Sequence, residues 1–311
     1  MEEAIVKVEH LSHRYSVQWA IRDVNFEISQ TGILGLLGSN GAGKSTTMNI
    51  ICGVLNQTEG DVYINGINTK ENPVEARRNI GFLPQKPPLY GDLNVDEYLI
   101  FCANLRLMDK SKIKDAVERV KERCGISHFS RRLIRNLSGG YQQRLGIAQA
   151  IIHEPKFVIL DEPTNGLDPN QILEVRHLIS DIAKEHAVLL STHILSEVHA
   201  MCDHILMIEN GSLIFSGTIN DFDNYIEPNS FLVTFERAPL VADLEQIQGV
   251  SRVEPLSDSN TRFRIFFDGD PDITKRFVQI SVNKGWELSE ISLEKSSMDE
   301  IFAQLSGKKK A

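Results

Sequence analysis

The stretch Gly38-Ser39-Asn40-Gly41-Ala42-Gly43-Lys44-Ser45-Thr46 has a glycine, four variable residues and then Gly-Lys-Ser, with a second hydroxyl residue behind it. The apolar run from Ile33 to Leu37 precedes it and is typical of a buried parallel strand. Residues 46 to 52 have helical spacing and end at Gly53. A strand, a glycine-rich loop and a helix in this order are the context that a phosphate-binding loop requires.

Each residue type in this loop has its own task. The glycines let successive backbone N–H groups and the start of the helix face one anion. Lys44 is placed to contact the β and γ phosphates of a nucleotide, and the Ser45 hydroxyl to coordinate Mg²⁺. At average residue frequencies the pattern arises by chance in about one chain in a hundred of this length. We therefore interpret the stretch as a phosphate-binding loop and not as a glycine turn without a ligand.

The composition is that of an ordinary globular protein, with 41% hydrophobic and 24% charged residues in a chain of 311. This length suffices for about two domains with their own cores. Lys and Arg number 33 against 42 Asp and Glu, and the net charge of −9 argues against general nucleic-acid binding, although a local basic patch stays open. Met1 to Ala4 lacks a signal-peptide core, and no apolar run approaches the roughly 18 residues of a membrane-spanning helix. We expect a cytosolic chain unless another subunit holds it at a membrane.

Cysteine and histidine patterns predict no metal site. The 4 cysteines are far apart and form no C-x-x-C pair, so we expect buried thiols in a reducing compartment. The closest histidine pairs lack carboxylate or thiolate neighbours and are interpreted as surface residues; they are His10 with His13 and His199 with His204.

Two segments before the loop, Ile5 to Glu9 and Val24 to Ile28, predict a small antiparallel sheet. Tyr15 lies between them in a polar context, where it is either a surface residue or a platform for a purine base, and the residues alone favour the surface. Residues 60–66 predict a strand closed by an Asn-Gly turn. Gln85 follows the next predicted strand and, taken by itself, is a structural residue.

Helical patterns follow at residues 95–107 and 112–124, with Ser111 as the predicted N-cap of the second. They indicate a helical insertion. Ser138-Gly139-Gly140 then opens a further helix. Ser138 is either a plain N-cap or, with its two glycines, part of a helix start whose free N–H groups bind phosphate.

A buried strand at residues 157–160 ends in two adjacent acids, Asp161 and Glu162. Acids at this position are hard to explain by packing, because an unpaired buried charge is costly. They suit a metal-linked acceptor and a base that orients water, at the strand edge where open α/β sheets bind ligands. His193 follows another buried strand, and a single histidine there is by itself more often structural.

The order of these motifs resembles the nucleotide-binding subunit of an ATP-binding cassette (ABC) transporter over residues 4–225. Chance could supply one such motif, but not the whole series in family order. The series comprises Walker A at 38–46, Gln85, the signature L-S-G-G-Y-Q-Q-R at 137–144, the Walker B end Asp161-Glu162, G-L-D-P at 166–169, and His193.

The resemblance implies a role for each matching residue. Lys44 would contact the β and γ phosphates, Glu162 would polarise water, and His193 would touch the γ phosphate. The catalytic set would be Glu162, His193, Lys44 and Gln85, and Mg²⁺ would be arranged by Ser45, Gln85 and Asp161. ATP would be bound by Tyr15 on its adenine and by Gly38, Ser39, Asn40, Gly41, Ala42, Gly43, Lys44, Ser45 and Thr46 of one subunit. Ser138, Gly139 and Gly140 of a second subunit would close on it.

The resemblance also predicts an α/β fold with a P-loop NTPase (RecA-like) core in residues 1–228, which includes an antiparallel β subdomain and a helical subdomain at about residues 90–150. Residues 229–311 show the order β-α-β-β-α-β and predict a small α+β ferredoxin-like domain. We interpret it as a structural or dimer-supporting element, with a ligand sensor as the alternative. Ser296 to Phe302 resembles the tail of type-2 exporter ATPases, a group that includes drug-resistance and gliding-motility systems.

The expected function is ATP hydrolysis in a head-to-tail dimer that powers transport, favouring export, through separate transmembrane permease subunits. The partner ATPase would be an identical or a similar chain, docked on the cytoplasmic face of the cell membrane, and nucleic acid is not an expected partner. The loop 86–94, with Leu89 and Tyr90, is apolar enough to dock a membrane subunit.

A cassette ATPase of DNA repair or translation is the alternative. Repair-type relatives carry long coiled coils, and translation factors usually carry two cassettes. Here one motif set occurs and only a short stretch separates Gln85 from Ser138. A module that binds ATP without hydrolysis is disfavoured by the intact Glu162 and His193.

Overall fold

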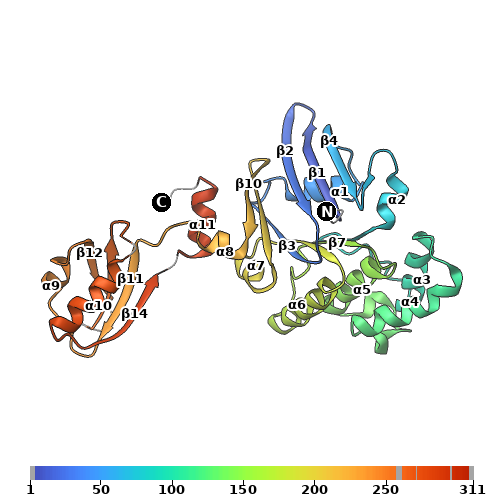
Figure 1. The fold of residues 1–311 in the computed structure, drawn as a ribbon. Helices are drawn as coiled ribbons and strands as arrows, with labels where there is room; N and C mark the ends of the chain where they lie inside the picture. The colour runs from blue at the N-terminus through green and yellow to red at the C-terminus, as the bar shows by residue number, and fades with distance from the viewer. Residues whose placement is uncertain (1–3, 257–260, 271, 295, 308–311) are drawn as a thin grey trace. The chain divides into compact units, whose positions relative to one another are not determined.

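The computed structural model describes residues 4–256, 261–270, 272–294 and 296–307. The chain folds into two compact units, of which the first ends at Ile219 and the second begins at Asn220 (Figure 1). The short helix α8 (Ile219–Asp223) stands at the boundary. Each unit encloses a hydrophobic core of its own.

A six-stranded sheet forms the centre of the first unit, in the order β10-β9-β3-β8-β7-β6. All neighbours pair in parallel except the hairpin of β9 and β10. The strands are β3 (Gly32–Leu37), β6 (Ile80–Leu83), β7 (Phe157–Asp161), β8 (Ala187–Ser191), β9 (His204–Glu209) and β10 (Ser212–Thr218). Because parallel strands end at one edge, the segments after β3, β6, β7 and β8 gather there.

Helices cover this sheet. α1 (Lys44–Ile51) shares a core with strands of the central sheet and of the antiparallel sheet, through Met48, Ile50 and Ile51. α5 (Gly139–Ile151) and α6 (Pro169–Ala183) contact β6, β7, β3 and β8 and lie across the sheet from α1 (Figure 1). The short helix α7 (Leu195–Met201) follows β8.

The second sheet of this unit is antiparallel, as predicted, in the order β2-β1-β4-β5. Its strands are β1 (Val6–Tyr15), β2 (Gln18–Ile28), β4 (Glu59–Ile64) and β5 (Ile67–Asn68). β1 runs well past the predicted end at Glu9, because the register shifts near His10, whose φ of 49° breaks the alternation that the sequence pattern follows.

His13 is a correction to the surface interpretation of the histidines. Its side chain is 8% exposed, and neither ring nitrogen has a hydrogen-bond partner within the described residues. It faces inward because it pairs with the buried Ile21 in the register of β1 and β2, and it packs edge-on against Tyr15. The cysteines, by contrast, are buried free thiols as expected.

Helices fill the region between β5 and α5. They are α2 (Pro73–Arg78), α3 (Val95–Leu105), α4 (Lys110–Arg123) and the 3₁₀ turns Ser127–Phe129 and Ile134–Asn136. The predicted N-cap of α4, Ser111, is wrong. Asp109 takes that place, and its carboxylate accepts from the backbone N–H of Ser111 at 2.9 Å. The Asp109 carboxylate, placed before Lys110 and Lys112, outcompetes the Ser111 hydroxyl two residues later.

The second unit has the predicted order of strands and helices: β11 (Ser230–Phe235), α9 (Val241–Glu245), β12 (Val250–Pro255), β13 (Arg262–Phe267), α10 (Ile273–Asn283), β14 (Leu288–Glu294) and then α11 (Met298–Leu305). Its sheet has the order β12-β13-β11-β14, and every neighbouring pair is antiparallel. In the core beneath it, the rings of Phe231 and Phe235 pack against Phe277, the first edge-on and the second tilted. Within the described part of the chain, no helix has the length and apolar character needed to cross a membrane.

Candidate nucleotide site

The loop from Gly38 to Lys44 joins β3 to α1, and close packing requires glycine at two of its positions. A Cβ on Gly38 would lie 2.2 Å from the carbonyl oxygen of Ile208. Gly43 has a φ of 113°, and a Cβ there would lie 2.5 Å from the side chain of Ile21. The loop therefore curls closely against β2 and β9, in a path that residues with a Cβ at these two positions could not follow.

Lys44 folds back onto this loop. Its Nζ donates to the carbonyl oxygens of Gly38 at 2.8 Å and Ser39 at 3.2 Å. Burial lowers the pKa of Lys44, while the carboxylates of Glu162, Asp161 and Glu209 act in the opposite direction. The ammonium group thus has neutral acceptors in its resting position and, among the residues that the structure describes, no carboxylate bonded to it, which leaves its charge available to an incoming anion.

The two acids after β7 differ in their surroundings. Burial raises the pKa of Asp161, and the charge of Glu162 adds to this shift. Glu162 has a φ of 50°, in the left-handed region, and its backbone N–H donates to the carbonyl oxygen of Ser191 at 2.9 Å. His193 Nδ1 lies 2.8 Å from Glu162 Oε2. A strained backbone at a non-glycine residue is typical of a functional position.

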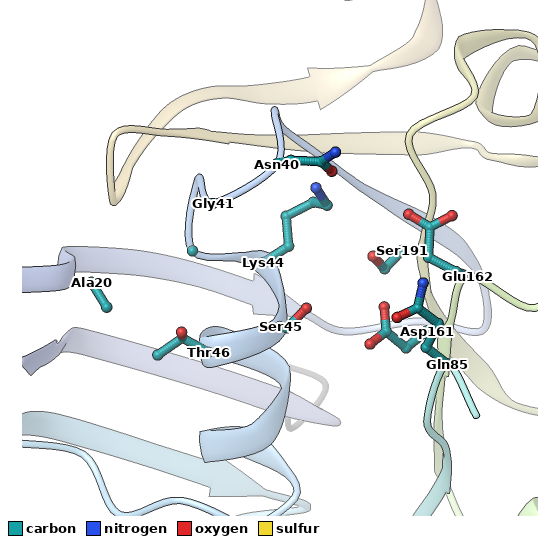
Figure 2. A pocket seen from close by; sticks show the side chains of 11 residues that line it. Ala20, Asn40, Gly41, Lys44, Ser45, Thr46, Gln85, Asp161, Glu162 and Ser191 are labelled. Carbon is teal, nitrogen blue, oxygen red and sulfur yellow. The ribbon is translucent and has the colours of Figure 1, made fainter. Parts of the chain in front are cut away.

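Lys44, Asp161 and Glu162 line one pocket of about 210 Å³ (Figure 2). Its lining is mostly polar and comprises Ala20, Asn40, Gly41, Gly43, Lys44, Ser45, Thr46, Gln85, Asp161, Glu162 and Ser191. Figure 2 shows the Ser45 hydroxyl facing Asp161 and Gln85 across the pocket. The volume is below the roughly 300 Å³ at which pockets begin to enclose drug-sized ligands, so it suits phosphates better than a whole nucleotide.

Other predicted site residues lie outside this lining. Tyr15 ends β1 with 54% of its surface exposed, and its ring meets the ring of His13 at 4.7 Å between centroids. Ser138 precedes α5 and is exposed together with Gly139, and its hydroxyl makes no capping hydrogen bond. The structure therefore brings the loop, Gln85, Asp161 and Glu162 together, with His193 bonded to Glu162, and leaves the Ser138 helix start apart.

Glu209 is a residue that sequence reasoning missed. It ends β9, is 8% exposed, and accepts from the Ser39 backbone N–H at 3.2 Å and from the Ser39 hydroxyl at 2.7 Å. The same signal that marked Asp161, an acid at the end of an apolar strand, was present in the sequence. Glu209 anchors the tip of the loop to the strand beside β3.

A six-stranded sheet with a lysine-bearing glycine loop and acids at its carboxyl edge defines a P-loop nucleotide-hydrolysing protein. The sequence profile described as ABC transporter matches residues 21–165. The uncharacterised ABC transporter ATP-binding protein YxlF of Bacillus subtilis is 30% identical over 97% of this chain and 99% of its own length. The bacitracin transport ATP-binding protein BcrA of Bacillus licheniformis is 33% identical over 97% of each.

Solved structures match the first unit. CbiO1 from Clostridium perfringens, part of the ABC transporter complex cbiONQ, superimposes with a TM-score of 0.64 and 30% identity over 70% of this chain and 89% of its own. The cassette MJ0796, a dimer in a post-hydrolysis state bound to ADP and Pi, does so with 0.62 and 25% over 69% and 98%. The chain belongs to the ATP-binding subunits of ABC transporters. It is an ATPase that energises transport.

Proposed function

We propose that two copies of this chain, or this chain and a similar ATPase, hydrolyse ATP head to tail and drive export through separate permease subunits. The exposed helix start at Ser138 carries the proposal. It offers N–H groups to an anion but is not among the residues that line the pocket with Lys44, which supports a site whose two halves come from two chains. The dimeric state of the related MJ0796 cassette agrees with this arrangement.

In the proposed complex the loop binds the phosphates of ATP. Lys44 leaves the carbonyl oxygens of Gly38 and Ser39 for the β and γ phosphates, with which it makes charge-assisted bonds. Adenine stacks on the exposed ring of Tyr15, whose plane His13 supports from the side. The phosphate contacts come from the backbone of Gly38, Ser39, Asn40, Gly41, Ala42, Gly43, Ser45 and Thr46, and from Ser138, Gly139 and Gly140 of the second chain.

The residues around Ser45 fit Mg²⁺. The Ser45 hydroxyl, the Asp161 carboxylate and the Gln85 amide oxygen are hard oxygen donors that line one side of the pocket, and such a set suits a small ion that keeps phosphate and water among its ligands. When bound, the ion neutralises charge on the phosphates. The positive charge of the ion would oppose the effect of burial on the pKa of Asp161 and favour the ionised carboxylate.

Glu162 supplies the base. A water molecule attacks the γ phosphorus, its proton passes to the Glu162 carboxylate, and the bond to the bridging oxygen breaks with both electrons on ADP. His193 orients this carboxylate through the bond at 2.8 Å and reaches the γ phosphate from the same side. The protein thus contributes positioning and charge stabilisation, which is most of what this reaction requires.

The permease subunits would dock on the loop 86–94, which includes Leu89, and on an apolar patch of three side chains, Tyr90, Ile100 and Phe101. These side chains are 57%, 43% and 39% exposed, and the rings of Tyr90 and Phe101 meet edge-on at 5.6 Å. The patch includes the loop that follows Gln85, so movement at the docked surface reaches the metal site directly. Export agrees with the bacitracin transport protein of Bacillus licheniformis and with the probable multidrug protein YbhF of Escherichia coli, which is 35% identical over 70% of this chain. The complex would sit on the cytoplasmic face of the membrane.

We further propose that residues 1–228 are the ATPase domain, with a RecA-like core and a helical subdomain at about 90–150, and that residues 229–311 are a ferredoxin-like accessory domain. The antiparallel order β12-β13-β11-β14 supports the second assignment. The solved cassettes cover 70% and 69% of this chain, whereas YxlF and BcrA cover 97%, which agrees with a separate module that these relatives share.

Mixing two inactive variants tests the shared site. Lys44→Met removes one half of each site and Ser138→Arg the other, so neither variant alone should hydrolyse ATP. In an equal mixture, half of the dimers contain one site with both halves intact, and about a quarter of wild-type activity should return. A mixture as inactive as its components would contradict the head-to-tail site.

A further inference from the structure

Next to His193 in the chain, the buried side chains of Thr192 and Glu197 form a cluster with the partly exposed Arg176. Thr192 follows β8, Glu197 lies on α7 and Arg176 on α6. Thr192 and Glu197 are both 0% exposed. The Thr192 hydroxyl donates to Glu197 Oε2 at 2.9 Å, and Arg176 Nη2 lies 3.5 Å from Glu197 Oε1. We refer to these residues as the Thr192 cluster.

This cluster sets the direction of one hydroxyl group. An ionised carboxylate only accepts hydrogen bonds, so the Thr192 proton must face Glu197. The lone pairs of Thr192 Oγ1 are then free for the backbone N–H of Ile194, which donates to it at 3.1 Å. The two bonds hold the backbone on both sides of His193, in the turn that brings its ring to Glu162.

Packing alone does not account for this carboxylate. Within the described residues, Glu197 Oε1 and Arg176 Nε have no hydrogen-bond partner, although both atoms are buried. A buried ion pair with unmet hydrogen bonds is usually no more stable than an apolar replacement of similar volume. Stability alone therefore gives little reason for this charge, and the turn that it contacts through Thr192 is the one that carries His193.

We propose that Glu197 and Arg176 are positioning residues for ATP hydrolysis, which hold His193 against Glu162 by fixing the Thr192 hydroxyl. The inference rests on the proposed role of His193. A glutamine at position 197 can donate its amide N–H to Thr192 Oγ1. The Thr192 proton then no longer has a fixed acceptor, and the lone pair that accepts from Ile194 is no longer held in place. Without Arg176, Glu197 loses the cationic group that lies 3.5 Å from its Oε1.

The test measures kcat for Mg²⁺-ATP and Kd for ADP in the full-length protein. Thr192→Val keeps the shape of the side chain and leaves the Glu197–Arg176 pair in place. It should lower kcat about three- to tenfold, the rate equivalent of one hydrogen bond, and leave the Kd of ADP unchanged because ADP lacks the γ phosphate. Thr192→Ser retains the hydroxyl and should restore most of kcat, and Glu197→Gln should lower kcat like Thr192→Val.

Glu294→Gln is the matched control. Glu294 accepts from Arg264 at 2.7 Å and from the Ser230 hydroxyl at 2.8 Å, so the second unit contains the same chemistry and none of the residues of the nucleotide pocket. This variant should leave kcat unchanged. If Glu197→Gln does not fold, Thr192→Val still decides, because it removes no charge.

Combining Thr192→Val with His193→Ala distinguishes a failure of this inference from a failure of the proposed role of His193. The single variant His193→Ala should be slow, and adding Thr192→Val should slow it no further, because the cluster acts through His193. Wild-type kcat in Thr192→Val, or a fully additive loss in the double variant, would overturn this inference and leave the proposed function intact. Wild-type kcat in His193→Ala would overturn the proposed role of His193 and the inference with it.

Discussion

Replacement of Gly139 by alanine should harm catalysis without harming the fold. Gly139 is the first residue of α5 and is exposed. Among the described residues, no atom lies within 4 Å of the position that a Cβ would occupy. The chain itself therefore tolerates the methyl group. If a γ phosphate from a second chain must approach this helix start, the methyl group stands in its way.

The expected effects of Gly139→Ala on thermal stability and on turnover have opposite signs. Alanine is better than glycine in a helix by up to about 1 kcal/mol, and less than this at the first turn. For a unit of this size the gain raises Tm by at most about 4 °C. A donor aimed at developing charge is worth about 10²-fold or more in kcat, so turnover should fall by about that factor if the methyl group keeps the N–H groups away.

Tm from thermal unfolding, the Kd of ADP and kcat from steady-state ATP hydrolysis can all be measured on one preparation. Gly140→Ala is the matched comparison, because a Cβ there would lie 2.6 Å from Gln171 Cδ and must displace that side chain. It should lose turnover without the gain in Tm. Wild-type turnover in Gly139→Ala would refute the reasoning, since the exposed helix start would then face no phosphate.

Three more variants test the metal site, the adenine contact and the docking surface. Burial raises the pKa of Asp161, so the folded state holds this proton more tightly than the unfolded state, and stability falls as pH rises from 3.8 through the folded pKa. Asp161→Asn should therefore raise the Tm of the nucleotide-free protein at pH 7 and abolish hydrolysis, and a lower Tm would contradict the shift. Tyr15→Ala should weaken ATP binding by about tenfold with kcat nearly unchanged, as the loss of one stacked base predicts, whereas unchanged affinity in equilibrium binding would place adenine elsewhere. Leu89→Asp with Tyr90→Asp should leave ATP hydrolysis by the isolated protein intact but uncouple transport in vesicles that contain the permease, and unaltered transport would exclude this docking surface.

Much of the site was predictable because its residues stand at the ends of apolar strands. Gln85, Asp161 and Glu162 each follow a short hydrophobic run, and parallel strands bring such ends to one edge. The loop before Lys44 needed only its glycine pattern and the strand ahead of it. These signals are local, so a single sequence contains them.

Other features depend on contacts that no local pattern encodes. Glu209 meets Ser39 only because β9 lies beside β3, and these strands are far apart in the chain. The bulge at His10 hides the true length of β1 and turns His13 inward. The clustering of Arg176, Glu197 and Thr192 likewise requires α6 and α7 to be placed first.

Size-exclusion chromatography of Glu162→Gln with Mg²⁺ and ATP tests the shared site most directly. The glutamine keeps the shape of the side chain but accepts no proton, and loss of a general base slows the step by about 10² to 10⁴. The γ phosphate then stays between Lys44 of one chain and the Ser138 helix start of the other. We predict a long-lived dimer that Ser138→Arg abolishes. A Glu162→Gln protein that stays monomeric under ATP and hydrolyses it at the wild-type rate would contradict both the role of Glu162 and the shared site.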